Sequence, residues 1–190
     1  ATNHYINSDN QDRPQLSIPK EWAQGRTAYG GLTGALVYSA IREKVSNDRV
    51  LRSFSCNFVG PVTTETPFDI EVDILRQGKN VTQVTGKAIQ DGNVCVMVQA
   101  AFGVSRESKI NLRNTDRHAM RAPTKADFLP QIPKITPKFL RHIDLARQGG
   151  GLPFTGSKES EIDGWMRFTD PPKALTDAHL IALIDGWPPA

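Results

Sequence analysis

The sequence predicts an α+β fold in which an antiparallel sheet packs against a helix. Three observations predict it. Four short runs between residues 50 and 104 alternate apolar with polar residues, as strands do, and residues 27–45 before them have the apolar spacing of a helix. Two further strand-like runs and one further helical segment follow near the C-terminus. The chain of 190 residues is long enough to bury a substantial core. Its composition, with 38% hydrophobic and 23% charged residues, excludes a disordered, collagen-like or coiled-coil chain.

The first expected element is a helix over residues 27–45. Its apolar residues Leu32, Leu36 and Ala40 share one helical face. This spacing predicts a helix that lies against a sheet.

Three glycines occur near the start of this helix, at Gly30, Gly31 and Gly34. A glycine inside a helix costs up to about 1 kcal/mol relative to alanine, so these positions need another explanation. Either the missing side chains let the helix pack closely on strands, or backbone N–H groups at the helix start meet a ligand. Both explanations stay open, and both can hold.

Four strands are expected next, over residues 50–60, 68–77, 80–90 and 93–104. In the second of these, the apolar residues Phe68, Ile70, Val72 and Ile74 alternate with acidic ones, which predicts one buried and one solvated face. Turn residues separate the later runs, and Asp91-Gly92 is typical of a tight hairpin. The four runs predict an antiparallel meander.

Similar signals return in the last third of the chain. Residues 138–148 and 161–168 alternate like strands, and the prolines at 171–172 should end the second strand at about Phe168. Thr176 then provides the capping chemistry for a helix in the segment TDAHLIALIDGW. That helix carries many apolar residues with no strands after it in this sequence, so we expect it to need a partner.

The composition limits location and chemistry. No stretch of about eighteen apolar residues occurs, and the first twenty residues lack the apolar core of a signal peptide, so we expect a cytoplasmic protein without a membrane span. Cys56 and Cys95 lie within expected strands, which predicts reduced, packed thiols. The four histidines show no zinc-ligand spacing, so no zinc site is expected.

The net charge of +3 is unevenly distributed. Residues 106–147 carry ten basic and four acidic side chains, whereas residues 1–105 carry ten of each. The basic residues are scattered with few aromatic residues between them, so nucleic-acid binding is not favoured. Two explanations remain: a solvated linker, or a segment that attracts an anionic ligand.

Asp185 is the strongest candidate for catalysis. It directly follows the apolar run LIALI, and burial there would raise its pKa and make it a better general base. A carboxylate in the last turn of a helix also faces the negative end of the helix dipole, which is unfavourable without a purpose. The alternative is a turn aspartate in Asp185-Gly186. His179 could line the same site, or it could be a polar residue at the helix start.

These residues resemble a known family. The helix introduced by Tyr29-Gly30-Gly31, the segment VLRSFSCNFVGPV and the three runs that follow are similar to the first half of the acyl-CoA thioesterase II family, the double-hotdog thioesterases. The similarity returns at Gly164-Trp165-Met166-Arg167 and at LIALIDGWPPA. In such a fold each repeat wraps an antiparallel sheet around a central helix, and two repeats pair.

The resemblance implies a domain organisation. It implies a first hotdog repeat at residues 1–105, a basic linker at residues 106–136 and the start of a second repeat at residues 137–190. The resemblance also implies that the second repeat is truncated in this sequence. Hotdog sheets commonly pair edge to edge, so a homo-oligomer is expected.

The resemblance also implies hydrolysis of fatty acyl-CoA to free fatty acid and CoA, by an attack of water that needs neither metal nor cofactor. Asp185 matches the family's catalytic aspartate, which activates water together with a Thr and a Gln expected beyond residue 190. Tyr29, Gly30 and Gly31 would bind substrate, with backbone N–H groups facing the thioester carbonyl. The alternatives are a non-catalytic acyl-CoA or acyl-chain binding protein and an assembly protein.

Overall fold

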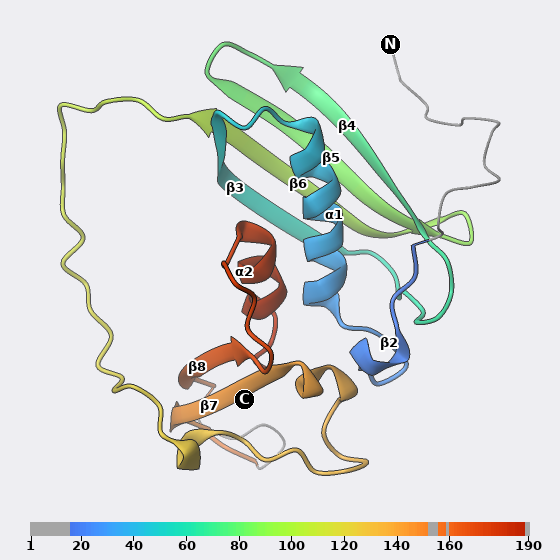
Figure 1. Ribbon diagram of the computed structural model, residues 1–190, viewed down its shortest axis with the longest axis vertical. Helices are drawn as coiled ribbons and strands as arrows, with labels where there is room; N and C mark the ends of the chain where they lie inside the picture. Colours follow the sequence, from blue (N-terminus) through green and yellow to red (C-terminus); the bar gives the residue numbers. More distant parts are fainter. Residues whose placement is uncertain (1–15, 152–155, 159, 189–190) are drawn as a thin grey trace.

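A computed structural model describes residues 16–151, 156–158 and 160–188. A long helix, α1 (Gly30–Lys44), lies across one face of a four-stranded antiparallel sheet (Figure 1). The strands are β3 (Arg49–Phe58), β4 (Asp69–Gln77), β5 (Val81–Gln90) and β6 (Asn93–Val104). The expected sheet and central helix are therefore confirmed.

The order of strands in the sheet is β3-β6-β5-β4. Strands β4, β5 and β6 form the expected meander, but β3 pairs with β6 at the far side, so the prediction of a meander through all four strands was wrong. Alternation identifies strands without identifying their neighbours. The segment between β3 and β4 lacks a hairpin turn, and it crosses from one edge of the sheet to the other (Figure 1).

The hairpin between β5 and β6 is as predicted. Asp91 and Gly92 have φ angles of 52° and 75°. Positive φ at both central residues is what a two-residue turn of the favoured hairpin type requires, and glycine reaches it without strain.

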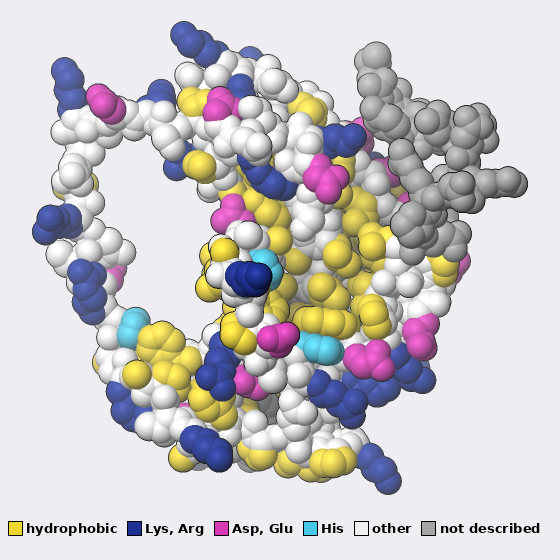
Figure 2. Space-filling model, viewed as in Figure 1, with side chains coloured by type: hydrophobic (Ala, Val, Ile, Leu, Met, Phe, Trp, Pro, Cys, Tyr) yellow, Lys and Arg dark blue, Asp and Glu magenta, His cyan; other side chains and the backbone are white. Residues whose placement is uncertain are grey.

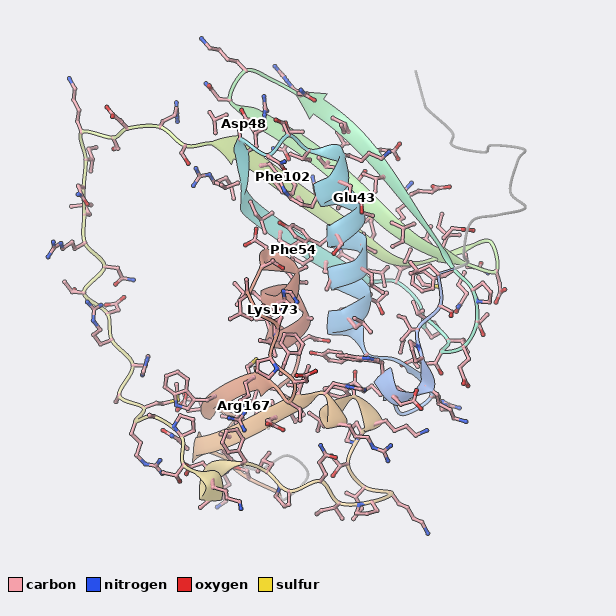
Figure 3. All side chains as sticks on the ribbon, viewed as in Figure 1. Glu43, Asp48, Phe54, Phe102, Arg167 and Lys173 are labelled. Atoms are coloured by element: carbon pink, nitrogen blue, oxygen red, sulfur yellow. The ribbon has the colours of Figure 1, made fainter. Side chains whose placement is uncertain are left out.

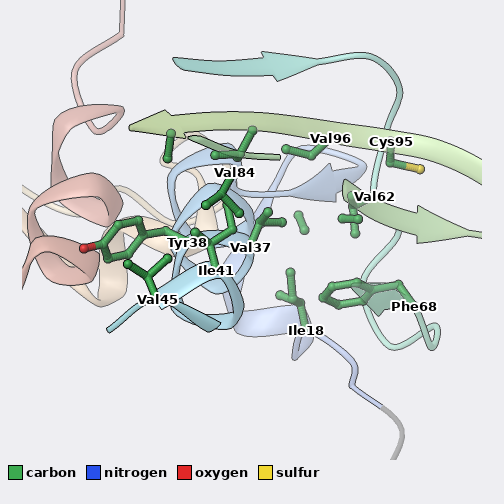
Figure 4. Packing of buried hydrophobic residues seen from close by; sticks show 14 of the residues in the cluster. Ile18, Val37, Tyr38, Ile41, Val45, Val62, Phe68, Val84, Cys95 and Val96 are labelled. Carbon is green, nitrogen blue, oxygen red and sulfur yellow. The ribbon is translucent and has the colours of Figure 1, made fainter. Parts of the chain in front are cut away.

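The main core lies between α1 and the sheet (Figure 4). Val37 and Ile41 of α1 are fully buried there. A Cβ at Gly86 of β5 would lie 2.7 Å from Cγ1 of Val37, so this glycine lets the helix approach the sheet. The buried face of α1 is therefore not the predicted one of Leu32, Leu36 and Ala40, which are only half-buried.

The predicted faces of β4 are correct along most of the strand. Phe68, just before β4, is buried, and Ile70 and Val72 pack against the core. Ile74 is 43% exposed, contrary to the prediction. It lies at a register shift of an edge strand, where the regular alternation of faces is lost.

The second part of the chain contributes a small antiparallel hairpin and a helix. Strand β7 (Ile143–Gly150) pairs with β8 (Ile162–Phe168), and α2 (Asp177–Ile184) follows. Strand β8 ends at Phe168 and α2 begins after Thr176, as predicted. The strand expected over 138–148 starts later, because residues 138–141 form a short 3-10 helix.

Helix α2 packs side by side with α1. Leu183 is buried in this contact region, whereas Leu180 and Ile184 are 56% and 79% exposed. The partner that this apolar helix was expected to need is thus supplied in part by α1 of the same chain.

Residues 105–124 contain no helix or strand, and they run as a wide loop away from the body of the molecule (Figures 1 and 2). Nearly all their side chains are exposed. Among the described helices, none combines the length and the apolar character that a membrane span needs.

Candidate functional site

The first turn of α1 meets the last turn of α2. We call this meeting point, formed by Tyr29, Gly30, Gly31, Ala182 and Asp185, the helix junction. The Tyr29 hydroxyl donates a hydrogen bond of 2.7 Å to the carbonyl oxygen of Ala182. Tyr29 has no exposed surface, and its ring stacks on Phe139 with centroids 4.1 Å apart.

A second hydrogen bond joins the middle of α1 to α2. The Tyr38 hydroxyl donates to the Asp177 carboxylate at 2.8 Å, at the start of α2. Tyr38 also contacts the rings of Phe54 and Phe102, which project from the sheet (Figure 3). The helices are therefore tied at two points and run antiparallel, which fixes Asp185 relative to α1.

Asp185 is the residue that ends α2. The Gly31 N–H donates a hydrogen bond to its carboxylate. Burial of the carboxylate on one side raises the pKa of Asp185 above its ordinary value, and the Gly31 hydrogen bond opposes that shift. The side chain keeps enough exposure for water to reach it.

The N-terminus of α1 compensates for the unfavourable position of Asp185 at the negative end of the α2 dipole. The carboxylate sits at the negative end of α2, but it faces the N-terminus of α1, where N–H groups have no acceptor inside the helix. No side chain caps that N-terminus, since residue 29 makes no side-chain cap hydrogen bond. The carboxylate takes over this role for Gly31.

The glycines at the start of α1 have different neighbours. A Cβ at Gly31 would lie 2.6 Å from the Tyr29 hydroxyl oxygen and 2.7 Å from the Ala182 carbonyl oxygen. A Cβ at Gly30 would lie 2.9 Å from Oδ2 of Asp185. Gly31 is therefore required for helix packing, and Gly30 lets the Asp185 carboxylate and the Phe58 ring lie close to the backbone. Gly34 faces Cys56, where a Cβ would lie 3.4 Å from Sγ, close to ordinary contact.

Cys56 lies closer to Asp185 than the sequence suggested. Burial raises the pKa of its thiol to about 11, and the negative charge of Asp185 contributes to the shift. Its thiol is free and only partly buried. Cys95 is free as well and is packed in the core, as expected.

A cavity of about 320 Å³ opens between α1 and α2 beside the helix junction. Ala182 lines it, so the cavity begins one helical turn from Asp185. Its other lining side chains are mostly apolar: Trp22, Leu32, Ala35, Leu36, Phe168, Pro172 and Ala178, with Ser39, Asp170 and His179 as polar members.

Three of the four candidate site residues lie together in space: Gly30, Gly31 and Asp185. Tyr29 is adjacent to them, but its side chain is fully buried and hydrogen-bonds to Ala182, so it stabilises the helix junction from the protein interior. His179 accepts a hydrogen bond from the Thr176 N–H at 3.2 Å, so it caps α2, and its side chain also lines the cavity.

Two residues near Asp185 were missed. The sequence predicts Cys56 to be a packed thiol and gives no functional signal for Phe58. Both belong to β3, and their proximity to α2 depends on a contact between segments more than 120 residues apart in the sequence. No local pattern signals such a contact.

Two models of protein families match this chain, one in each part of the sequence. The family model for the acyl-CoA thioesterase N-terminal domain matches residues 18–103, and the model for the acyl-CoA thioesterase C-terminal domain matches residues 116–190. Acyl-CoA thioesterase 2 of Haemophilus influenzae is 34% identical over 79 residues, which is 42% of this chain and 28% of that protein.

Solved structures confirm the hotdog fold. A conserved protein of unknown function with a hotdog fold from Alicyclobacillus acidocaldarius superposes with a TM-score of 0.74 at 25% identity, covering 91% of this chain and 63% of that one. The acyl-CoA thioesterase II of Mycobacterium marinum superposes with a TM-score of 0.57 at 18% identity, covering 90% and 62%. This chain thus spans less than two thirds of the length of these relatives.

Proposed function

Because this chain belongs to the acyl-CoA thioesterase family, we propose that it hydrolyses fatty acyl-CoA to a free fatty acid and CoA, with Asp185 as the general base. The observation that carries the proposal is the position of the Asp185 carboxylate at the start of α1, where a Cβ at Gly30 would lie 2.9 Å from Oδ2 and where the Gly31 N–H interacts with the carboxylate. A base held by one hydrogen bond and partly shielded from water is oriented for proton transfer and more basic than a free aspartate.

The proposed reaction needs one water molecule. Asp185 takes a proton from the water as its oxygen attacks the thioester carbonyl carbon. The tetrahedral intermediate then releases the CoA thiolate as the carbon–sulfur bond breaks, and the proton leaves Asp185 for the thiolate. The products are a carboxylic acid and a free thiol, so atoms and charge balance.

The start of α1 can stabilise the negative oxygen of the intermediate. Helix geometry leaves the N–H groups of Gly30 and Leu32 without acceptors inside the helix, while Gly31 is engaged by Asp185. A donor directed at a developing oxyanion contributes about 3 kcal/mol to the transition state. The absence of a side chain at Gly30 lets the Asp185 carboxylate lie against this backbone.

The cavity beside the helix junction provides a place for the acyl chain. Its volume of about 320 Å³ is at the small end of the range of about 300–1,000 Å³ usual for ligand pockets. Its mostly apolar lining suits a hydrocarbon chain, and Ala182 connects it to the junction. The exposed basic side chains of residues 106–124 would attract the phosphates of CoA.

Release of free thiol from acyl-CoAs of several chain lengths tests this function. The wild-type chain should show turnover that depends on chain length, and Asp185→Asn should reduce it by two or more orders of magnitude. Asp163→Asn, which replaces an exposed aspartate of β8, is the matched control and should keep wild-type turnover. Equal turnover in Asp185→Asn and wild type would refute the assignment of the base.

A binding protein is the alternative that the same cavity supports. Calorimetry with acyl-CoA distinguishes the two functions, because a binding protein would take up the ligand without releasing thiol. In that case Asp185→Asn would leave the dissociation constant nearly unchanged.

A further inference from the structure

Another cavity, of about 490 Å³, lies where β6 ends and the wide loop of residues 105–124 begins, beside the first residues of β3 (Figure 1). Its lining differs from that of the cavity between α1 and α2, because most of its side chains are polar or charged. These come from β3, from the turn before β5 and from the loop: Arg52, Asn80, Arg106, Glu107 and Ser108. Such a lining suits a polar ligand rather than a hydrocarbon chain.

An irregularity in β3 directs Arg52 to this cavity. The pairing of β3 with β6 shifts its register at Arg52, so this residue is the extra residue of a β-bulge. Its side chain lies over Gly103 of β6, where an added Cβ would be 3.3 Å from Cγ of Arg52. Nη2 of Arg52 donates two long hydrogen bonds of 3.4 Å, to the Val104 carbonyl oxygen and the Ser105 hydroxyl oxygen. The absence of a side chain at Gly103 therefore lets Arg52 reach across β6.

The two arginines that line the cavity have no ionic partner within the described part of the chain. The ion pairs there join Arg121 to Asp127 and Arg167 to Asp144, and they include neither Arg52 nor Arg106. Glu107 lines the same cavity without pairing with either arginine. The guanidinium groups therefore keep their charge and most of their N–H donors for a ligand.

Arg49 adds a positive charge close to the same place. Its buried side chain donates hydrogen bonds to the Thr82 hydroxyl at 2.6 Å and to the Gly78 carbonyl oxygen at 2.8 Å, and both of these acceptors are neutral. Arg49 pairs in the sheet with Val104, which lines the cavity. Three guanidinium groups against one carboxylate give this end of the sheet a positive potential that attracts anions.

The donors and acceptors of the cavity indicate the class of ligand. The fork of a guanidinium group matches two oxygens of a phosphate, and the Asn80 amide can donate a further hydrogen bond. The ionised Glu107 can only accept hydrogen bonds, so it suits a hydroxyl or amino group beside the phosphate. A volume of about 490 Å³ holds much more than a phosphate group. A ribose phosphate with its base combines these features.

We infer that this cavity binds a phosphorylated nucleotide, with Arg52 and Arg106 at the phosphate and Glu107 at a ribose hydroxyl or a base amino group. The inference goes beyond the proposed function, because it does not require Asp185 to hydrolyse a thioester. The nucleotide end of CoA and a free nucleotide share this chemistry, and competition between the two distinguishes them.

Calorimetry with adenosine 3′,5′-bisphosphate tests the inference. The wild-type chain should bind it, and Arg52→Gln and Arg106→Gln should each weaken binding about tenfold or more, because hydrogen bonds between charged groups are lost. Arg26→Gln removes an exposed arginine in the turn at residues 25–26, so it is the matched control and should keep the wild-type dissociation constant. Inorganic phosphate should bind at least tenfold more weakly than the nucleotide.

Two results would overturn the inference. One is the absence of nucleotide binding to the wild-type chain, or equal dissociation constants in wild type and both cavity variants. The other is equal affinity for inorganic phosphate and the nucleotide, which would mean that the cavity binds small anions without selecting a nucleotide.

Competition with CoA identifies the source of the nucleotide. If CoA displaces adenosine 3′,5′-bisphosphate, and Arg52→Gln weakens both to the same extent, the cavity holds the nucleotide end of CoA. If CoA does not displace it, the cavity holds a free nucleotide. None of these measurements involves thioester hydrolysis, so nucleotide binding can be established even if the hydrolase proposal fails.

Discussion

The Tyr29 hydroxyl donates a hydrogen bond to the carbonyl oxygen of Ala182, 153 residues later in the chain. The carbonyl groups in the last turn of a helix have no partner within the helix, and this one is buried. Tyr29 therefore satisfies a carbonyl at the end of α2 from the residue that precedes α1. The same contact places Asp185, three residues after Ala182, at the start of α1.

Replacing Tyr29 by Phe should destabilise the protein by about 1–3 kcal/mol, because the Ala182 carbonyl then stays buried without a donor. The ring and its stacking on Phe139 are kept, so the change reports on the hydroxyl alone. Urea unfolding followed by tryptophan fluorescence measures the loss. An unfolding free energy equal to wild type would show that the hydroxyl does not stabilise the helix contact.

Two neighbouring glycines should respond differently to the same substitution. Gly31→Ala places a methyl group against the Ala182 carbonyl and the Tyr29 hydroxyl, so it should cost about 1–3 kcal/mol of stability. Gly30→Ala meets the Phe58 ring and the Asp185 carboxylate, which are side-chain ends that can move. It should leave the unfolding free energy nearly unchanged and lower kcat/KM at least tenfold. Equal losses of stability in both variants would contradict this difference.

The sequence predicts the individual turns, strands and helices better than it predicts which of them lie next to each other. The Asp91-Gly92 turn, the end of β8 at Phe168 and the start of α2 after Thr176 follow from residues within a few positions of each feature. The pairing of β3 with β6 does not, because it depends on a segment that crosses between sheet edges.

The candidate site likewise contains some residues that the sequence indicates and others that only the structure shows. Asp185 and the glycines were identifiable because an acidic residue after an apolar run, and glycines in a helix, each violate a local rule. The unfavourable dipole at Asp185 is compensated by α1, which no local pattern places there. Phe58 and Cys56 violate no rule of a strand, so only the three-dimensional structure shows that they are near Asp185.

Asp185 should make stability depend on pH in the direction opposite to an ordinary salt-bridged aspartate. Its pKa is raised in the folded state, so the folded protein binds the proton more tightly than the unfolded chain does. The ionised carboxylate therefore lowers stability above the folded pKa, and this penalty disappears as the pH falls below the ordinary value of 3.8. Asp185→Asn should unfold at a slightly higher temperature than wild type at pH 7, and the difference should vanish toward pH 3.

Thermal unfolding of both proteins from pH 3 to pH 8 measures this dependence. Asp163→Asn serves again as the exposed control and should show no such convergence. A melting temperature of Asp185→Asn below that of wild type at pH 7 would mean that the ionised carboxylate stabilises the fold.

The Cys56 thiol should react slowly with thiol reagents near neutral pH. Burial, and secondarily the charge of Asp185, raise its pKa to about 11, and only the thiolate is nucleophilic. In a Cys95→Ala background, the alkylation rate should still be increasing at pH 10. Adding Asp185→Asn removes the neighbouring charge, so the rate profile should shift to lower pH while the effect of burial remains. Identical profiles in the two proteins would place the Cys56 thiol outside the influence of Asp185.

Charge reversal in the wide loop of residues 105–124 tests whether its basic side chains attract an anionic ligand or only form a solvated linker. Arg113 and Arg117 lie in its exposed part, so Arg113→Glu with Arg117→Glu should leave the fold intact. If the loop attracts the phosphates of CoA, the double variant should raise KM for acyl-CoA several-fold at low salt, and the difference should shrink at 0.5 M salt because charges in solvent are screened there. Replacing both arginines by lysine keeps the charge and should keep the wild-type KM. An unchanged KM of the glutamate variant at low salt would identify residues 106–124 as a solvated linker without a role in binding.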